Sequence, residues 1–239
     1  MSNTYFQFKQ FIIHQESCAM KVCTDACLFG AWMAGKVVGG QMAVDSVLDI
    51  GAGTGLLSLM IAQQSAARID AVELDKHAAT QASDNFELSK WKERLQLIQG
   101  DIKTLHLGKK YDLIISNPPF FENDLKSADT QRNLALHSNE LSLPELLAAI
   151  KKHLAENGKF AVLLPYHRKI EFEKLALEEG FFVEEEISVK QTPAHNFFRM
   201  MFLFGKEACV AKTDSLTIRD GEQYTSEFID LLREYYLKL

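Results

Sequence analysis

From Ser46 onward, the chain alternates short apolar runs with longer amphipathic segments, and this alternation constrains the fold more than any other feature. The apolar runs predict strands buried on both faces, and the amphipathic segments predict helices between them. Such an order is typical of an α/β fold, in which helices cover both faces of a mostly parallel sheet. Asn157-Gly158 and Gly180 follow the last two predicted helices as stop signals. The predicted strands are 47–51, 69–74, 95–99, 111–116 and 160–164, and the predicted helices are 55–67, 76–88, 143–154 and 169–179.

The tail of the chain departs from this alternation. Segments 182–190 and 197–205 are joined by a short link around Thr192-Pro193-Ala194-His195, which leaves no room for a helix. Two strands joined so closely pair antiparallel, so we expect a hairpin added to the mostly parallel sheet. After Asp220-Gly221, apolar residues at helical spacing predict a docked C-terminal helix.

Composition excludes several classes of protein. The 239 residues include 32 acidic and 26 Lys and Arg side chains, a net charge of -6, which argues against a surface that binds nucleic acid everywhere. A local basic patch remains compatible with this charge. The apolar stretch Ala26–Gly35 is ten residues long, whereas a membrane helix needs about 20. The N-terminus lacks a secretory signal, so we expect a cytoplasmic protein without membrane attachment.

Four cysteines are present, at Cys18, Cys23, Cys27 and Cys209. The first three are five and four residues apart and have no neighbouring histidine pair, a spacing that does not match a zinc finger or ribbon. We interpret them as reduced thiols of a cytosolic protein, and no metal is expected.

A glycine-rich loop joins the first predicted strand to the first predicted helix, with the pattern Asp49-x-Gly51-x-Gly53-x-Gly55. Glycines are needed where the backbone approaches a ligand closely. The loop differs from a dinucleotide-binding fingerprint, because Leu56 stands where the third glycine of that pattern belongs. Asp49 would also repel a pyrophosphate. The loop therefore favours a cationic ligand.

Two more acidic residues end the next two predicted strands. Glu73 is placed to accept hydrogen bonds from both hydroxyls of a ribose. Asp101 is placed to hold an adenine amino group, with Ile102 covering the ring. Because ligands of open α/β sheets bind at the carboxyl ends of the strands, Asp49, Glu73 and Asp101 together predict a nucleoside site there.

Asn117-Pro118-Pro119-Phe120 follows the fourth predicted strand. An aromatic exocyclic amine is a poor nucleophile, because its lone pair is delocalised into the ring. The oxygens of the Asn117 side chain and the Pro118 carbonyl can each accept one N–H bond and orient the nitrogen, and Phe120 can stack on a planar base. Group transfer to such a nitrogen needs mainly positioning and electrostatics, so Asn117, Pro118 and Phe120 are the catalytic candidates.

These motifs resemble the S-adenosylmethionine-dependent methyltransferases of the Rossmann-like class. The resemblance implies a mostly parallel seven-stranded sheet with a C-terminal antiparallel hairpin, helices on both faces, and S-adenosylmethionine as cofactor. The cationic sulfonium of that cofactor suits the acidic loop. The residues it implies for cofactor binding are Asp49, Gly51, Ala52, Gly53, Thr54 and Gly55 near the methionine moiety, Glu73 and Leu74 at the ribose, Asp101 and Ile102 at the adenine, and Asn117.

The N-terminal segment is similar to that of the bacterial valine-tRNA adenine-N6 methyltransferases, on Phe6-x-Phe8-Lys9-Gln10-Phe11 and above all on the stretch 20–32. Arg132-x-x-Ala135-x-His137 and the tail 224–237 also fit that family, whereas Cys23 stands where the family has glycine. This resemblance implies methyl transfer to N6 of adenine 37, which follows the anticodon. It implies that Lys21, Thr24 and Asp25 border the cofactor pocket, and that Pro119, Phe121, Arg132 and His137 bind the substrate. Without the family, the i, i+4 spacing of Lys21 and Asp25 predicts a surface ion pair.

We interpret the chain as a single methyltransferase domain, 1–239, and expect a monomer. Its segment 1–45 would border the cofactor and substrate pocket, and 46–239 would form the Rossmann-like core and C-terminal helix. The long connection 121–142 is interpreted as a substrate-gripping lid. The basic residues expected to gather on one rim for tRNA are Lys126, Arg132, His137, Lys151, Lys152, His153, His167, Arg168, Lys169, His195 and Arg199, with Tyr166 among them.

Three other functions remain open from the residues alone. The Asn-Pro-Pro-Phe motif indicates transfer to a planar nitrogen, and does not choose between adenine N6, guanine N2 and a glutamine amide. The alternatives are therefore a glutamine-N5 methyltransferase of a release factor and a guanine-N2 methyltransferase of rRNA. The third is a nucleic-acid-binding module that has kept the fold without the activity.

Overall fold

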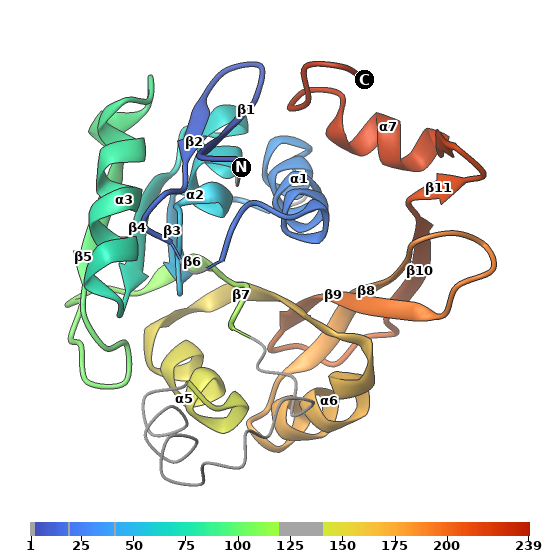
Figure 1. Ribbon diagram of the computed structural model, residues 1–239. Helices are drawn as coiled ribbons and strands as arrows, with labels where there is room; N and C mark the ends of the chain where they lie inside the picture. The colour runs from blue at the N-terminus through green and yellow to red at the C-terminus, as the bar shows by residue number, and fades with distance from the viewer. Residues whose placement is uncertain (1–2, 19, 41, 120–140) are drawn as a thin grey trace, which may run out of the picture.

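The computed structural model describes residues 3–18, 20–40, 42–119 and 141–239, and its centre is one eight-stranded sheet (Figure 1). The strand order is β10-β8-β9-β7-β6-β3-β4-β5, and every neighbouring pair is parallel except the two that β9 makes. The strands are β3 (Ser46–Ile50), β4 (Arg68–Glu73), β5 (Leu95–Gln99), β6 (Tyr111–Ser116), β7 (Leu154–Pro165), β8 (Phe182–Lys190), β9 (Phe197–Gly205) and β10 (Lys212–Thr217).

Helices cover both faces of this sheet, as the sequence predicts. Two separate apolar cores result, one under each helical layer. One layer holds α1 (Thr24–Val38), α2 (Leu56–Gln64), α3 (Lys76–Glu87) and α7 (Ser226–Leu232), and the other holds α5 (Leu143–His153) and α6 (Lys169–Glu178). None of the described helices is long and apolar enough to cross a membrane.

The predicted strands and the antiparallel hairpin are confirmed, but the sheet has eight strands and not the expected seven. The additional strand, β10, pairs in parallel with β8 at the edge of the sheet. Its sequence, Lys-Thr-Asp-Ser-Leu-Thr, buries only Leu216. An edge strand this polar lacks the alternation by which a strand is detected from sequence.

The predicted helix 143–154 is confirmed to within one residue, but Asn157-Gly158 is not its stop signal. Helix α5 ends at His153, and β7 begins at once with Leu154. The glycine instead lies in an irregular part of β7, where the register to β6 jumps from Leu154 to Lys159. A Cβ at Gly158 would lie 2.8 Å from the Tyr111 carbonyl oxygen, so the close approach of two strands explains this glycine.

Helix α1 was not predicted, because its sequence has no amphipathic period. Residues 26–34 are all buried, and the helix packs between α2 and α7. A helix buried on every side is apolar on every side. Ala26–Gly35, which is too short for a membrane span, is thus the central part of a core helix.

The two ends of the chain pack against each other above α1 and α2 (Figure 1). The N-terminal strands β1 (Tyr5–Gln7) and β2 (Ile12–His14) form a hairpin, and Phe8, in its turn, bridges to Tyr236. Beyond α7, the Tyr235 hydroxyl donates a 3.0 Å hydrogen bond to the Met60 carbonyl of α2. The docked C-terminal helix is therefore confirmed; a short hairpin, β11 (Arg219–Asp220) and β12 (Gln223–Tyr224), precedes it.

Candidate functional site

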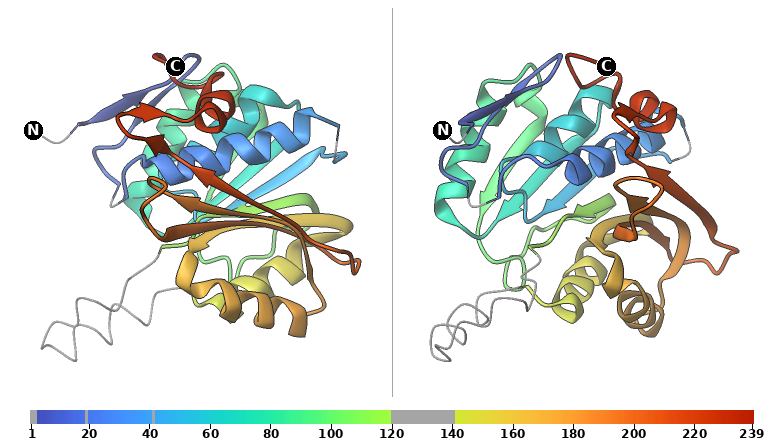
Figure 2. Two further views of the ribbon diagram at one scale, coloured as in Figure 1. Left: turned by 90° about the vertical axis from the view of Figure 1, so that its right-hand side faces the viewer. Right: turned by 45° about the vertical axis from the view of Figure 1, so that its right-hand side comes forward.

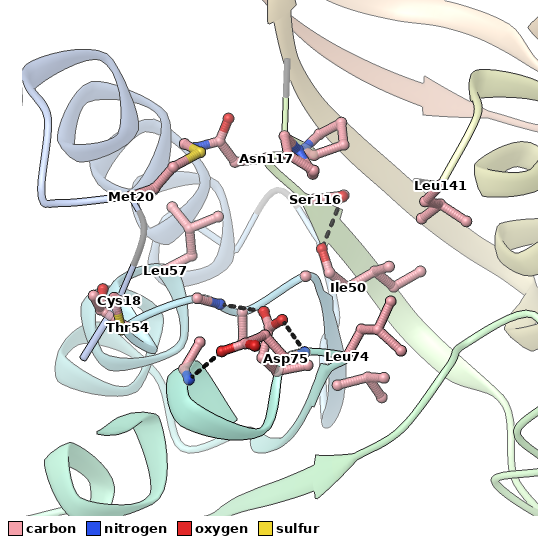
Figure 3. A pocket seen from close by; sticks show the side chains of 18 of the residues that line it. Cys18, Met20, Ile50, Thr54, Leu57, Leu74, Asp75, Ser116, Asn117 and Leu141 are labelled. Atoms are coloured by element: carbon pink, nitrogen blue, oxygen red, sulfur yellow. Dashed lines mark hydrogen bonds between the residues drawn. The ribbon is translucent and has the colours of Figure 1, made fainter. Parts of the chain in front are cut away.

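A cavity of about 580 Å³ lies at the carboxyl ends of β3 to β6 (Figure 3). The glycine loop and the ends of three neighbouring strands form its floor and sides, and residues that precede and begin α1 close it from the opposite side. Of the predicted site residues, those that line it are Lys21, Gly51, Ala52, Gly53, Thr54, Glu73, Leu74, Asp101, Ile102, Asn117, Pro118 and Pro119. A volume of this size accommodates a nucleoside-sized ligand.

The glycine loop adopts a backbone that other residues rarely can. Gly51, Gly53 and Gly55 have φ angles of 75°, 56° and 80°. The amides of Gly51 and Ala52 both donate to the Val72 carbonyl at the end of β4, at 2.9 and 3.1 Å. These bonds draw the loop over the strand end and leave Gly51 exposed toward the cavity.

Glu73 is fixed by the backbone on both of its oxygens. Oε2 accepts from the Gly53 amide at 2.8 Å, and Oε1 accepts from the Asp75 amide at 2.9 Å. The half-buried carboxylate therefore has a defined orientation at the cavity and retains lone pairs for a ligand. Asp75 in turn caps α3 by accepting from the Ala78 amide (Figure 3).

At the end of β5, Asp101 and Ile102 form the next part of the lining. The Lys103 amide donates to Asp101 Oδ1 at 2.9 Å, while the Lys103 ammonium lies 3.7 Å from Oδ2. Ile102 is buried and presents an apolar surface. A carboxylate and an aliphatic side chain at one strand end suit the amino group and the face of a purine.

Asn117 carries the least explained polar atom of the cavity. Its Oδ1 is buried and has no hydrogen-bond partner among the described residues. The preceding Ser116 donates to the Ile50 carbonyl at 2.8 Å, which ties the end of β6 to the end of β3 and fixes the start of the motif (Figure 3). A buried amide oxygen without a donor costs about 1–3 kcal/mol. A ligand N–H is the natural partner of such an atom.

Asp49 lies below the loop and does not line the cavity, contrary to the expected place beside the ligand. Its side chain is fully buried, and Oδ2 accepts from the Ser58 hydroxyl of α2 at 2.7 Å. Burial raises the pKa of this carboxyl to about 7, against the lowering effect of Ser58. The placement follows from the strand, because Asp49 belongs to β3 and its side chain points into the interior.

Thr24, Asp25 and Gly55, also predicted for the cofactor, lie outside the cavity lining too. Gly55 is covered by the ring of Phe86 from α3. Asp25 forms an ion pair with Arg199 of β9, with Oδ2 and Nε 2.7 Å apart. Asp25 and Gly55 thus connect α1 and the glycine loop to neighbouring elements.

Five predicted residues lie outside the described part of the chain: Phe120, Phe121, Lys126, Arg132 and His137. The connection interpreted as a lid falls there as well, apart from its last two residues. Of these two, Leu141 lines the cavity.

Several functional side chains carried no sequence signal. Asn85 of α3 is buried and donates to the Thr54 carbonyl and to the His14 carbonyl, both at 2.9 Å, which joins the glycine loop to the N-terminal hairpin. Gln15, also buried, accepts from the Val22 amide at 2.9 Å. Such contacts join residues far apart in sequence, so no local spacing predicts them.

The cysteines are free thiols, as expected. Cys18 lines the cavity, and burial, with Glu73 and Asp75 close by, raises the pKa of its thiol to about 11. A thiol this weakly acidic stays protonated at neutral pH and is a poor nucleophile. Across the described residues, no group of three or more His, Cys, Asp or Glu side chains could hold a metal ion.

Not all of the basic residues predicted for one rim lie together. Lys151, Lys152 and His153 end α5 immediately before β7 begins, so they lie at the opposite edge of the sheet from the cavity. His153 is buried as well. Tyr166, His167 and Arg168 follow β7 and lie at the cavity edge.

Comparison with known proteins gives one consistent family. The model of the methyltransferase small domain family matches residues 40–192. A relative from Cytophaga hutchinsonii, named tRNA1(Val) (adenine(37)-N6)-methyltransferase, is 41% identical over 246 residues, and the alignment covers 100% of both chains.

Solved structures share the fold at lower identity. A protein from Agrobacterium tumefaciens described as a predicted O-methyltransferase superposes with a TM-score of 0.67 and 16% identity, over 88% of this chain and 96% of that one. The glycopeptide N-methyltransferase MtfA, solved with S-adenosylmethionine, gives a TM-score of 0.52 and 14% identity, over 75% and 88%.

Proposed function

The chain belongs to the family of the bacterial tRNA1(Val) (adenine(37)-N6)-methyltransferases, and from this premise we propose that it methylates N6 of adenine 37 in a valine tRNA. The cofactor is S-adenosylmethionine. The observation that carries the proposal is the buried Asn117 Oδ1, which lies at the cavity and receives no hydrogen bond from the part of the chain that the structure describes. An exocyclic amine of a base supplies the missing donor.

The described residues fit this cofactor. The backbone of the glycine loop leaves an open surface, since a Cβ at Gly51 or Gly53 would have no protein atom within 4 Å. Glu73 would accept from the ribose hydroxyls, and Asp101 with Ile102 would hold the adenine. Lys21 and Asn117 would border the methionine end, which places the methyl group next to the acceptor. When bound, the cofactor supplies an electrophilic methyl group on a sulfonium.

Asn117 and Pro118 would orient the acceptor. The Asn117 side-chain oxygen and the Pro118 carbonyl each accept one N–H of the amine, which aims the nitrogen lone pair at the methyl carbon. Hydrogen bonds to both protons increase the electron density on the nitrogen and stabilise the positive charge that develops there. As the new N–C bond forms, the bond from the methyl carbon to sulfur would break and a neutral thioether would leave. The nitrogen would then lose one proton to water, so no strong base is required. The adenine must leave its stack to reach this position.

The neighbours of the motif would complete the acceptor site. Phe120 would stack on the adenine, and Pro119, Phe121, Arg132 and His137 would bind the surrounding RNA. The full chain, 1–239, would act as one domain and as a monomer, with 1–45 bordering the pocket. A tRNA substrate would be consistent with a cytoplasmic location.

One assay separates this function from its rivals. Labelled S-adenosylmethionine is incubated with the protein and, in parallel, unmodified tRNA, rRNA and a release factor. We expect label in tRNA alone. Label in the release factor would favour glutamine-N5 transfer, label in rRNA would favour guanine-N2 transfer, and no label in any acceptor would favour a module without activity.

A further inference from the structure

The sheet edge that holds the cavity continues past β6 along the other half of the sheet. Strands β7, β8 and β10 run parallel to β6, and β9 runs against them. The ends of β7, β8 and β10 therefore lie at the same edge as Asn117, together with the start of β9. Figure 2 (left) shows the orange turn between β8 and β9 on the same side of the molecule as the blue N-terminal segment.

Aromatic rings and cations gather at this edge. The rings of Tyr166, directly after β7, and Phe197, at the start of β9, lie 5.3 Å apart. The Lys190 ammonium at the end of β8 lies 5.5 Å from the centre of the Phe197 ring. Beyond β10, the Arg219 guanidinium lies 4.1 Å from the centre of the Tyr224 ring.

Some cations at this edge pair with a carboxylate, and two others have no carboxylate partner in the described part of the chain. Arg199 pairs with Asp25 at 2.7 Å, and Arg168 pairs with Glu171 at 2.6 Å. For Lys190 and Arg219, by contrast, no described carboxylate lies within ion-pair distance. The Arg219 guanidinium donates one hydrogen bond to the Glu222 carbonyl and lies over the Tyr224 ring.

The two cations also lie close to each other in the sheet. Lys190 pairs with Thr217 in the register of β8 and β10, and the Arg219 amide donates to the Gln191 carbonyl at 3.0 Å. Both therefore project from adjacent strand ends, on the side of Tyr166 and Phe197 away from the cofactor half of the sheet.

We propose that Tyr166, Lys190, Phe197 and Arg219, hereafter the cationic edge, bind the RNA strand that flanks the acceptor adenine. This inference rests on the proposed function. Cations without a carboxylate partner bind phosphates, and the half-buried rings of Tyr166 and Phe197 keep accessible surface on which unpaired bases can stack. A loop nucleotide that leaves its stack has unpaired neighbours on both sides, and these are the bases such rings accept. The overall charge of -6 makes a local site of this kind necessary for an RNA substrate.

The test is direct binding of a labelled anticodon stem-loop of a valine tRNA, followed by fluorescence anisotropy over a range of salt concentrations. The double variant Lys190→Gln/Arg219→Gln should raise the Kd about tenfold and reduce the slope of log Kd against log salt by about 1.4–1.8, which corresponds to two lost phosphate contacts. Tyr166→Leu should raise the Kd by a similar factor and leave the slope unchanged, because stacking releases no counterions.

The matched control is Lys151→Gln/Lys174→Gln, which removes an equal number of positive charges, two, from exposed sites on α5 and α6. It should leave the Kd and the slope within about twofold of the wild type. Cofactor affinity by calorimetry should be unchanged in both double variants, since none of the four residues lines the cavity.

Two outcomes separate the cationic edge from the proposed function. If the wild type methylates tRNA while Lys190→Gln/Arg219→Gln binds the stem-loop with unchanged Kd and slope, the function stands and the cationic edge is wrong. If the double variant loses binding while the wild type transfers no methyl group, the cationic edge stands and the function is wrong.

Discussion

Near the candidate site, two buried side-chain oxygens have no hydrogen-bond donor within the described ranges, one on Asn117 and one on Asp49. The Asn117 oxygen lies at the cavity, where a ligand can reach it. The Asp49 oxygen lies beneath the glycine loop and belongs to a carboxyl whose pKa burial raises to about 7. The missing hydrogen-bond donor thus indicates substrate binding at Asn117. At Asp49 it indicates a structural role that depends on protonation.

Replacing Asn117 tests the first of these roles. Asn117→Ala should lower the single-turnover rate of methyl transfer at least about 100-fold, because the acceptor amine loses one of its orienting partners. Cofactor affinity, measured by calorimetry, should change by less than about threefold. Asn117→Asp should keep part of the rate, since its carboxylate oxygen still accepts an N–H bond. A normal rate for the alanine variant would contradict the assigned role.

Asp49 should make stability depend on pH. Its pKa is about 7 in the folded protein and about 3.8 in the unfolded chain, so the folded state holds the proton more tightly. The resulting stabilisation is complete below the unfolded value and is lost as pH rises through about 7. Urea unfolding at pH 5 and pH 8 should show the wild type losing about 2 kcal/mol relative to Asp49→Asn. A constant difference between the two proteins would show that Asp49 is ionised throughout.

Sequence alone predicted the cavity residues that lie at strand ends, among them Glu73, Asp101 and Asn117. The sequence predicted less well the residues whose side-chain direction depends on contacts with neighbouring elements. Asp49 points inward because its strand is buried on both faces, and Asp25 turns toward Arg199, which is 174 residues away along the chain. A local pattern contains no information on such distant partners.

Among the elements, the glycine loop shows most clearly how backbone conformation shapes the site. Gly51 and Gly55 have similar left-handed φ angles, but their surroundings differ. A Cβ at Gly51 would meet no protein atom within 4 Å, whereas a Cβ at Gly55 would lie 2.5 Å from Cε1 of Phe86. The first glycine leaves space for a ligand, and the second lets α3 pack against the start of α2.

This difference gives a matched pair of variants. Gly51→Ala should cost about 1–2 kcal/mol of unfolding free energy, from backbone strain alone. Gly55→Ala should cost about 1–3 kcal/mol more, because Phe86 must also move. Urea unfolding of both variants measures the difference. Equal losses would mean that the packing of Phe86 against Gly55 contributes nothing to stability.

The elements that the sequence missed share one physical cause. Helix α1 is buried all round and β10 is polar on nearly every position, so neither has the periodicity of its element. The irregular part of β7 contains a glycine that also fits a helix end. Tertiary packing decides each of these cases, and local sequence does not.

At the scale of the whole molecule, the fold divides the sheet edge into two functional halves. The ends of β3 to β6 form the cavity, and the ends of β7, β8 and β10 carry the cationic edge. Asn117 lies at the border, where the proposed cofactor and RNA sites meet. The residues that precede and begin α1 close the cavity. The N-terminal hairpin before them is bound to the C-terminal segment through contacts such as the 2.8 Å bond from the Lys9 amide to the Tyr235 carbonyl.

The most direct test of the account is the identity of the methylated atom. Unmodified valine tRNA is incubated with the protein and S-adenosylmethionine, digested to nucleosides and analysed by mass spectrometry, beside a transcript in which adenine 37 is replaced by guanine. The account predicts N6-methyladenosine from the first tRNA and no methylated nucleoside from the second. Methylation at another atom or position, or equal methylation of both transcripts, would contradict it.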